Sequence, residues 1–303
     1  MLAGAAGCLQ GASGGRRGGG PPAIVDPQTA VKGLGGKWIV LDARPRSECE
    51  SSRAEGAVCL PLEALMPHPP GMLGRGARAR LGRRVAQAGA DWDTPILVIG
   101  GSGWNGLRRA AAACWLTSLV ETGECHVLAG GHEAWKAAGG AVVAGPGTRT
   151  AASGNAPLHV PSVPLTWAGE EALRHATIEP DVAIVQVSSP EPHPRVPGAY
   201  ELAAARLALS SGAPDVRSML QRLADEGLLA EEQIIVLGNE LEDGALGWFL
   251  LDRVAELPEV RLYPGGLARY REHAHLPLRD VQKALEKGSP EGGTQLDDRK
   301  VGG

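Results

Sequence analysis

The chain has 303 residues and a formal net charge of −4, with a sequence pI near 6.1. This mildly acidic balance gives no reason to expect nucleic acid or an anionic membrane surface as a partner. No apolar run approaches the roughly 20 residues that a membrane-spanning helix needs, and the length suits two domains, each large enough for its own hydrophobic core.

The first 22 residues consist mainly of Gly, Ala and Ser, with two arginines and no acidic residue. This composition is typical of a disordered tail, although an acid-free start with arginines is also compatible with an organelle transit peptide. Residues 23–141 then alternate strands and helices. We expect strands at Trp38–Asp42, Gly56–Pro61, Ile96–Ile99 and His126–Leu128, and helices at Pro27–Leu34, Ala77–Gly89, Leu107–Leu119 and Gly130–Trp135.

Residues 142–164 are rich in Gly, Ala, Ser, Thr and Pro and are predicted to form a linker. The same order of elements then returns in residues 165–280. Residues 286–303 are predicted to be a second disordered tail. In the second half we expect helices at Trp167–His175, Pro214–Gly227, Ala245–Leu251 and Gly265–Tyr270, and strands at Ala183–Val187, Ile234–Gly238 and Arg261–Tyr263.

Three landmarks recur in the same order and at a nearly constant spacing. Gly56 has a counterpart in Gly198, the strand that begins at Ile96 has one that begins at Ile234, and Gly130 has one in Gly265. Such spacing predicts a tandem repeat with small insertions and deletions. Strands that alternate with helices predict an α/β fold, in which each repeat holds a short, mostly parallel sheet flanked by helices.

On these landmarks, which span about residues 24–278, the chain resembles the tandem rhodanese-domain family, the thiosulfate and 3-mercaptopyruvate sulfurtransferases. The segments that carry the resemblance are Leu41–Pro45 with Ser47 and Glu48, Gly56–Val58, Ile96–Gly100, Val127–Gly131 with Ala134 and Trp135, Val196–Ala199, Leu220–Leu223, Ile234–Gly238 and Leu262–Gly266.

The resemblance implies two rhodanese-like domains packed face to face. It also implies that a cysteine opens the loop after the central strand of the second domain. In the family this thiolate takes a sulfane sulfur from thiosulfate or mercaptopyruvate, carries it as a persulfide and passes it to cyanide or a thiol. Loop N–H groups and a helix N-terminus lower the pKa of the thiol and hold the substrate anion. The first domain is usually an inactive copy.

In this sequence both nucleophile positions are glycine, Gly238 in the second half and Gly100 in the first. The second loop is also acidic, which would raise the pKa of a neighbouring thiol and repel thiosulfate. Gln186 and Ser188 replace the usual Asp and Arg, and Arg53 and Arg195 replace a usual His. We therefore predict that sulfur transfer is absent and that the active-site loop is vestigial. Its residues are Asn239, Glu240, Leu241, Glu242, Asp243 and Gly244.

The five cysteines all lie within the first 125 residues and show no CxxC pair. This spacing favours a reducing compartment over a disulfide scaffold. Cys114 follows four alanines in an apolar helix and is expected to be a buried hydrophobe, whereas Cys49 lies in a polar stretch and looks the most reactive. An active sulfurtransferase that uses a cysteine of the first half is the first alternative.

The loop after Ile99 spells GxGxxG between a strand and a helix, the fingerprint of dinucleotide binding. The next strand lacks an acidic residue for a ribose, so a dinucleotide-binding enzyme is only the second alternative. The milder prediction is that backbone N–H groups and a nearby arginine hold a small anion. The candidate anion-binding residues are Gly101, Ser102, Gly103, Trp104, Asn105, Gly106 and Arg108.

The leading hypothesis is therefore an inactive rhodanese-like protein, or pseudoenzyme, that acts as a binding or scaffold protein. We expect no cofactor and no metal site, because no His or Cys pairs have metal-ligand spacing. The expected partner is a small anion, or a basic protein at the acidic second loop. The predicted location is cytoplasmic, with mitochondrion or plastid as the alternative.

Overall fold

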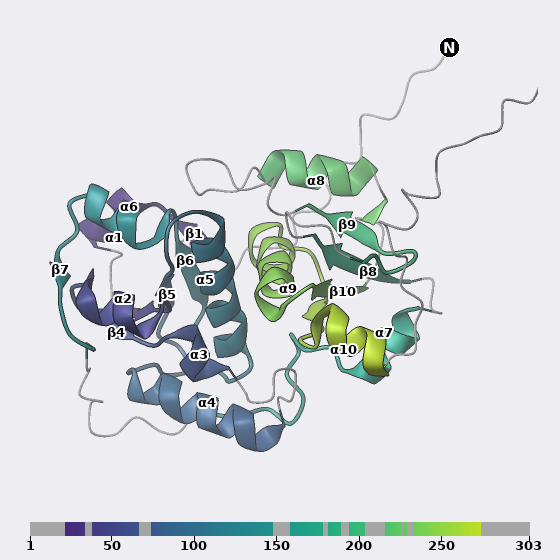
Figure 1. Cartoon of the computed structure of the whole chain (residues 1–303), viewed down its shortest axis with the longest axis horizontal. Helices are drawn as coiled ribbons and strands as arrows, with labels where there is room; N and C mark the ends of the chain where they lie inside the picture. Colours follow the sequence, from purple (N-terminus) through teal and green to yellow (C-terminus); the bar gives the residue numbers. More distant parts are fainter. Residues whose placement is uncertain are drawn as a thin grey trace, which may run out of the picture.

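The computed structural model describes residues 22–33, 38–66, 74–147, 158–177, 181–188, 194–203, 216–225, 227–228 and 233–273. The two predicted tails lie outside these ranges, apart from Pro22, and so does the middle of the predicted linker. Within the described ranges the fold is α/β, with parallel sheets flanked by helices (Figure 1).

The first sheet has five parallel strands in the order β1-β6-β5-β2-β4. Side chains alternate between its two faces, as the pleat requires. Ile96 and Val98 of the central strand face one hydrophobic cluster, whereas Leu97 and Ile99 face another. Because both faces are covered, this strand is apolar without interruption, as the sequence predicts. The strands are β1 (Ile24–Val25), β2 (Ile39–Asp42), β4 (Val58–Cys59), β5 (Ile96–Ile99) and β6 (Cys125–Leu128).

Helices cover both faces of this sheet, and α5 begins at Gly103, before the predicted Leu107. The predicted linker begins too early, because its first two residues form β7 (Val142–Val143), which pairs antiparallel with β3 (Arg53–Ala54). The helices of this half are α1 (Pro27–Lys32), α2 (Arg46–Ser51), α3 (Leu62–Leu65), α4 (Arg75–Gln87), α5 (Gly103–Ser118) and α6 (Gly131–Ala137).

The second sheet has four parallel strands in the order β11-β10-β8-β9, and an isolated parallel bridge from Trp167 to Leu262 extends it beside β11. None of the helices within the described ranges is long and apolar enough to cross a bilayer. The elements are α7 (Glu170–Ala176), β8 (Val182–Val187), β9 (Tyr200–Leu202), α8 (Val216–Asp225), β10 (Gln233–Gly238), α9 (Leu241–Trp248), the π-helix η3 (Phe249–Val254), β11 (Val260–Leu262) and α10 (Gly266–His273).

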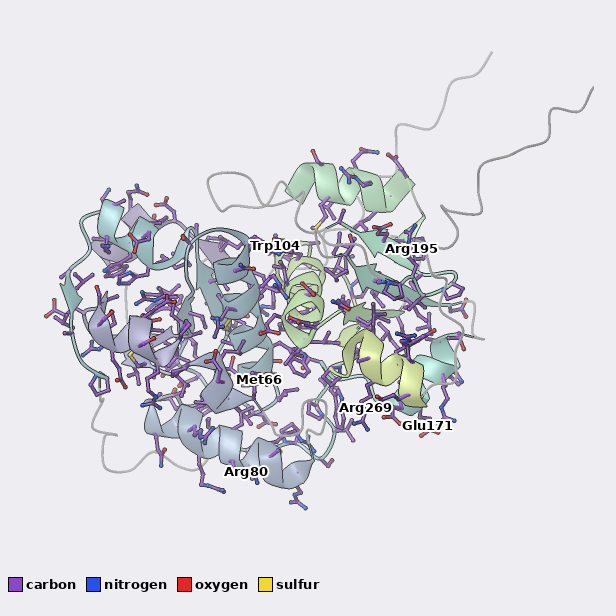
Figure 2. The ribbon with its side chains drawn as sticks, viewed as in Figure 1. Met66, Arg80, Trp104, Glu171, Arg195 and Arg269 are labelled. Carbon is purple, nitrogen blue, oxygen red and sulfur yellow. A yellow bond between two sulfur atoms is a disulfide. The ribbon has the colours of Figure 1, made fainter. Side chains whose placement is uncertain are left out.

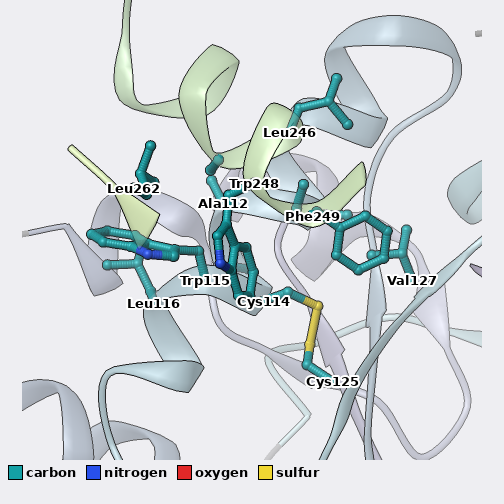
Figure 3. Packing of buried hydrophobic residues seen from close by; sticks show 14 of the residues in the cluster. Ala112, Cys114, Trp115, Leu116, Cys125, Val127, Leu246, Trp248, Phe249 and Leu262 are labelled. Atoms are coloured by element: carbon teal, nitrogen blue, oxygen red, sulfur yellow. A yellow bond between two sulfur atoms is a disulfide. The ribbon is translucent and has the colours of Figure 1, made fainter. Parts of the chain in front are cut away.

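The inner helices of the two halves share one hydrophobic core. Across Figure 1 the layers run from α1 and α6 through the first sheet to α5, and then from α9 through the second sheet to α7 and α10. Every residue of Ala110–Thr117 is buried, because α5 lies between its own sheet and α9. Four alanines in succession let the two helices approach closely, and Trp115, Trp248 and Phe249 fill the space around them (Figure 3).

Two disulfides correct the prediction that the cysteines are unpaired. Cys49, predicted to be the most reactive, is fully buried and bonded to Cys59, and Cys114 is bonded to Cys125 (Figure 3). Cys114 is buried as predicted, but its partner lies on the neighbouring strand β6. Spacing along the chain cannot show this pairing, because only the α5–β6 crossover brings the two residues together. Disulfides are typical of proteins in oxidising compartments.

Opening the Cys114–Cys125 bond is expected to destabilise the protein. A double Cys114→Ala, Cys125→Ala variant should lose about 3 kcal/mol of unfolding free energy, because the unfolded chain regains the freedom of the closed loop. Denaturant unfolding without reductant measures the loss. The matched Cys49→Ala, Cys59→Ala variant opens a loop of similar length, with 10 residues of separation against 11. Unfolding midpoints equal to the wild type in both variants would contradict the structural role.

Candidate functional site

The candidate site lies where β5 and β10, the central strands of the two sheets, lead through short loops into α5 and α9. The carboxyl ends of parallel strands are the usual place for a ligand in such folds. The two loops face each other, because Arg108 in the second turn of α5 contacts Glu240 and Asp243 at the start of α9. The two helices therefore run in the same direction with their N-termini together.

Neither loop has room for a side chain at the predicted nucleophile position. A Cβ atom built on Gly100 lies 2.1 Å from the carbonyl oxygen of Gly106. One built on Gly238 lies 2.3 Å from the backbone nitrogen of Gly244 and 2.6 Å from the Cβ of Asp243. Backbone atoms cannot move aside as a flexible side chain can. The loops have therefore closed over the place that a cysteine would occupy.

A second glycine, at the start of the helix that follows the next strand, packs against the backbone of each loop. Gly131 and Gly266 both adopt a φ of +61°, a conformation that L side chains rarely adopt. A Cβ on Gly131 would lie 2.1 Å from the carbonyl oxygen of Gly101, and one on Gly266 would lie 2.7 Å from that of Asn239. The paired-glycine motifs that the sequence shows once in each half thus have the same position relative to each loop.

The candidate anion-binding residues divide into an exposed and an enclosed group. Ser102, Gly103 and Asn105 are exposed, whereas Gly106 is buried against the carbonyl of Gly101. Trp104 packs on the shared core where α5 and α9 meet (Figure 2). The sequence predicts a loop up to Gly106, but the segment from Gly103 belongs to α5. Its N–H groups therefore belong to the first turn of a helix.

Arg108 is already paired within the protein. Its Nε atom lies 2.8 Å from Oδ1 of Asp243, and one terminal nitrogen lies 3.3 Å from Oε2 of Glu240. The neighbouring Arg109 pairs with Glu63 of α3. The anions closest to these two arginines in the structure are therefore carboxylates of the same chain.

The predicted acidic loop is largely the first turn of α9, which begins at Leu241. Glu240 and Asp243 form a capping box. The Glu240 carboxylate accepts a hydrogen bond from the backbone N–H of Asp243, and the Asp243 carboxylate accepts one from the backbone N–H of Glu240. Asp243 is 1% exposed, and burial raises the pKa of its carboxyl despite the nearby Arg108. Glu240 is 66% exposed at its side chain, so only part of the acidic run faces solvent.

A buried polar cluster beneath the first loop was not predicted as a site. Asp42 is fully buried and bonds bidentately to Arg44, whose guanidinium also donates to the carbonyl of Ser52. His132 is buried nearby, and burial together with the Arg44 charge lowers its pKa. The Asp-x-Arg spacing is the sequence signal for this pair. In the second half Gln186 bonds instead to backbone groups of residues 194 and 196.

The described cysteines cannot supply the missing nucleophile in their oxidised state, since all four form the two disulfides. Among the residues that the structure describes, no cluster of three or more His, Cys, Asp or Glu side chains is arranged to hold a metal ion.

Residues 26–138 match the sequence profile of the rhodanese-like domain. A rhodanese-like domain is therefore present within residues 26–138. The match covers nearly the whole first sheet, its helices and the loop after β5, which includes Gly100.

Several solved structures share the fold of this chain. A variant of EanB in complex with ergothioneine has a TM-score of 0.71 at 17% sequence identity, covering 84% of this chain and 69% of that one. The anaerobic ergothioneine biosynthesis enzyme from Chlorobium limicola, in complex with its natural substrate trimethyl histidine, gives the same values. In another EanB structure ergothioneine is covalently linked with a persulfide cysteine. At such low identity the likeness shows the fold alone. No curated protein matches the sequence.

Proposed function

We propose that this protein is a catalytically inactive member of the rhodanese-like sulfurtransferases, built from two diverged copies of the fold, and that it acts as a binding or scaffold protein. The observation that carries the proposal is the collapsed glycine pair: neither Gly100 nor Gly238 has space for a thiol, and backbone atoms fill both positions. A nucleophile that passes sulfur must stand free at the mouth of the loop.

The two sheets support the proposed tandem arrangement. Strand order β11-β10-β8-β9 repeats β6-β5-β2-β4, and the bridge at Trp167 stands where β1 stands in the first sheet. The two alternatives lack such support. Any of the four described cysteines would first have to be reduced, and the GxGxxG loop packs on itself, with Gly106 against the carbonyl of Gly101.

The proposed binding surface lies at the N-termini of α5 and α9. The indole N–H of Trp104 is buried and finds no acceptor within the described ranges, which favours a small anion beside the exposed residues Ser102 and Asn105. The exposed carboxylate of Glu240 favours a basic protein segment next to it. Both partners use the surface that a substrate would occupy in an active relative.

Sulfur transfer from thiosulfate to cyanide tests the inactive state. We expect no thiocyanate above the buffer rate, and no protein that gains the mass of one sulfur atom after thiosulfate treatment. Gly238→Cys should stay inactive, because its Cβ would overlap the backbone of Gly244. Gly76→Cys, at an exposed position of α4 where a Cβ meets only the end of the Arg80 side chain at 3.9 Å, controls for a surface thiol.

Turnover by the oxidised wild-type protein, or a persulfide on any of its cysteines, would refute the proposal. Restored turnover in Gly238→Cys alone would leave the inactive state intact and show that the loop can reopen, which would contradict the collapsed geometry.

A further inference from the structure

A pocket lies at the opposite end of the α5–α9 pair from the two loops. It has a volume of about 460 Å³, within the range of small-molecule sites. The loops lie at the N-terminus of α5 and the pocket at its C-terminus, so the 16 residues of this helix separate them by about 24 Å. Both halves line the pocket, and the Cys114–Cys125 disulfide forms part of its wall beside Trp248 (Figure 3).

Two buried hydrogen-bond donors of this wall have no acceptor among the described residues. Trp248 is 2% exposed and its indole Nε1 is unpartnered, as is the Nε atom of Arg253. Buried N–H groups are seldom left without a partner, because the unmet hydrogen bond destabilises the folded protein. Both residues line the same pocket, so the two unpartnered donors lie in or behind one wall of it.

The π-helix η3 explains why these side chains share one face. Trp248, Asp252 and Arg253 are spaced i, i+4 and i+5, and all three line the pocket. In an α-helix the residue five positions on turns away from the first, whereas the wider turn of a π-helix brings positions i+4 and i+5 to the same side. Short π-helical insertions of this kind are frequent at functional sites.

The pocket is also acidic. Glu121, Glu124 and Asp252 line it, and among the described lining residues Arg253 is the one cationic side chain. Glu121 pairs with His159, and Glu124 lies 3.8 Å from Arg253 and 4.0 Å from His126. Burial raises the pKa of Asp252 to about 6, against the opposing effect of Arg253. At neutral pH this poorly solvated carboxylate would gain from a ligand cation.

From these contacts we infer that the pocket binds a small zwitterion of the α-amino-acid class. Its carboxylate accepts from Trp248 Nε1 and Arg253, and its ammonium group lies against Asp252 and the glutamates at the rim. A ligand with only a negative charge would meet three carboxylates, and one without an acceptor oxygen would leave both donors unpaired. This site is independent of the two collapsed loops and goes beyond the function proposed for them.

Three matched probes test the two ends of the ligand separately. L-Valine has both groups, 3-methylbutanoate lacks the ammonium group, and L-valinamide lacks the carboxylate. With tryptophan indole nitrogens labelled, the Trp248 N–H resonance, assigned by its loss in Trp248→Phe, should shift saturably with L-valine. The other two probes should shift it at least tenfold more weakly. No shift with L-valine, or equal shifts with all three probes, would overturn the inference.

Calorimetric titration of the full chain with L-valine does not depend on the Trp248 variant. Arg253→Gln should weaken binding at least about tenfold through loss of a charge-assisted hydrogen bond, and Asp252→Asn should weaken it through loss of the ammonium partner. Arg261→Gln, whose exposed ion pair with Glu259 lies outside the pocket, should bind as the wild type does. Unchanged affinity in Arg253→Gln and Asp252→Asn would overturn the inference.

Discussion

Gly238→Ala is expected to lower the free energy of unfolding by at least about 3 kcal/mol, a large effect for one methyl group. The added Cβ would lie 2.3 Å from the nitrogen of Gly244 and 2.7 Å from the carbonyl oxygen of Glu240, and both atoms belong to the first turn of α9 and its cap. Relief of the overlap requires the turn to move away from β10. Chemical denaturation monitored by circular dichroism measures the loss.

The control is Gly76→Ala in α4, where a Cβ meets only Arg80 Nη1 at 3.9 Å. This change should be neutral or slightly stabilising, because alanine favours helices more than glycine does. Gly100→Ala, which places a Cβ 2.1 Å from the Gly106 carbonyl, should behave like Gly238→Ala. If both loop variants were as stable as Gly76→Ala, the loops would have space for a side chain, which would contradict the collapsed geometry.

Arg108→Ala is expected to destabilise the protein by about 3 kcal/mol at pH 8, because it leaves the buried Asp243 carboxylate without its cation. The loss should depend on pH. Burial already raises the pKa of Asp243 above its ordinary 3.8, and removal of Arg108 raises it further. A carboxyl whose pKa is higher in the folded protein than in the unfolded chain lowers stability once the pH rises above its pKa in the unfolded chain. The difference from wild type should therefore shrink toward pH 4, as unfolding curves at both pH values would show.

Arg109→Ala is the matched control, since this neighbouring residue pairs with Glu63, which is 60% exposed, and should cost less than about 1 kcal/mol. Combining Arg108→Ala with Asp243→Asn should recover most of the stability at pH 8, because the buried charge is then absent. A loss in Arg108→Ala that is equal at both pH values, or that Asp243→Asn does not relieve, would mean that packing and not charge holds this contact.

The fold was largely predictable because its signals are local and strong. β5 and β10 are continuous apolar segments between turn residues, and the sequence predicts both together with the helix that follows each. The short elements were missed. α3 has four residues and β3 has two, so neither is long enough to show a period, and β3 exists only because β7 pairs with it.

The sequence predicts that the candidate site lacks its cysteines, but it does not predict how the two loops pack. Glycine at both nucleophile positions is read directly from the chain, as is the acidic run that follows Asn239. The same run is compatible with a solvated loop or with a helix turn. The capping box and the Arg108 contact decide for the helix, and they bury one of its three carboxylates.

The sequence by itself determined the α/β alternation, the repeat of landmarks and the absence of sulfur at the two loops, because each depends on residues adjacent in the chain. Only the tertiary structure decided which cysteines pair, which charges meet across α5 and α9, and that a pocket exists beside Trp248. Each of these joins residues from separate elements, and no local periodicity specifies the distance between two such elements once they pack.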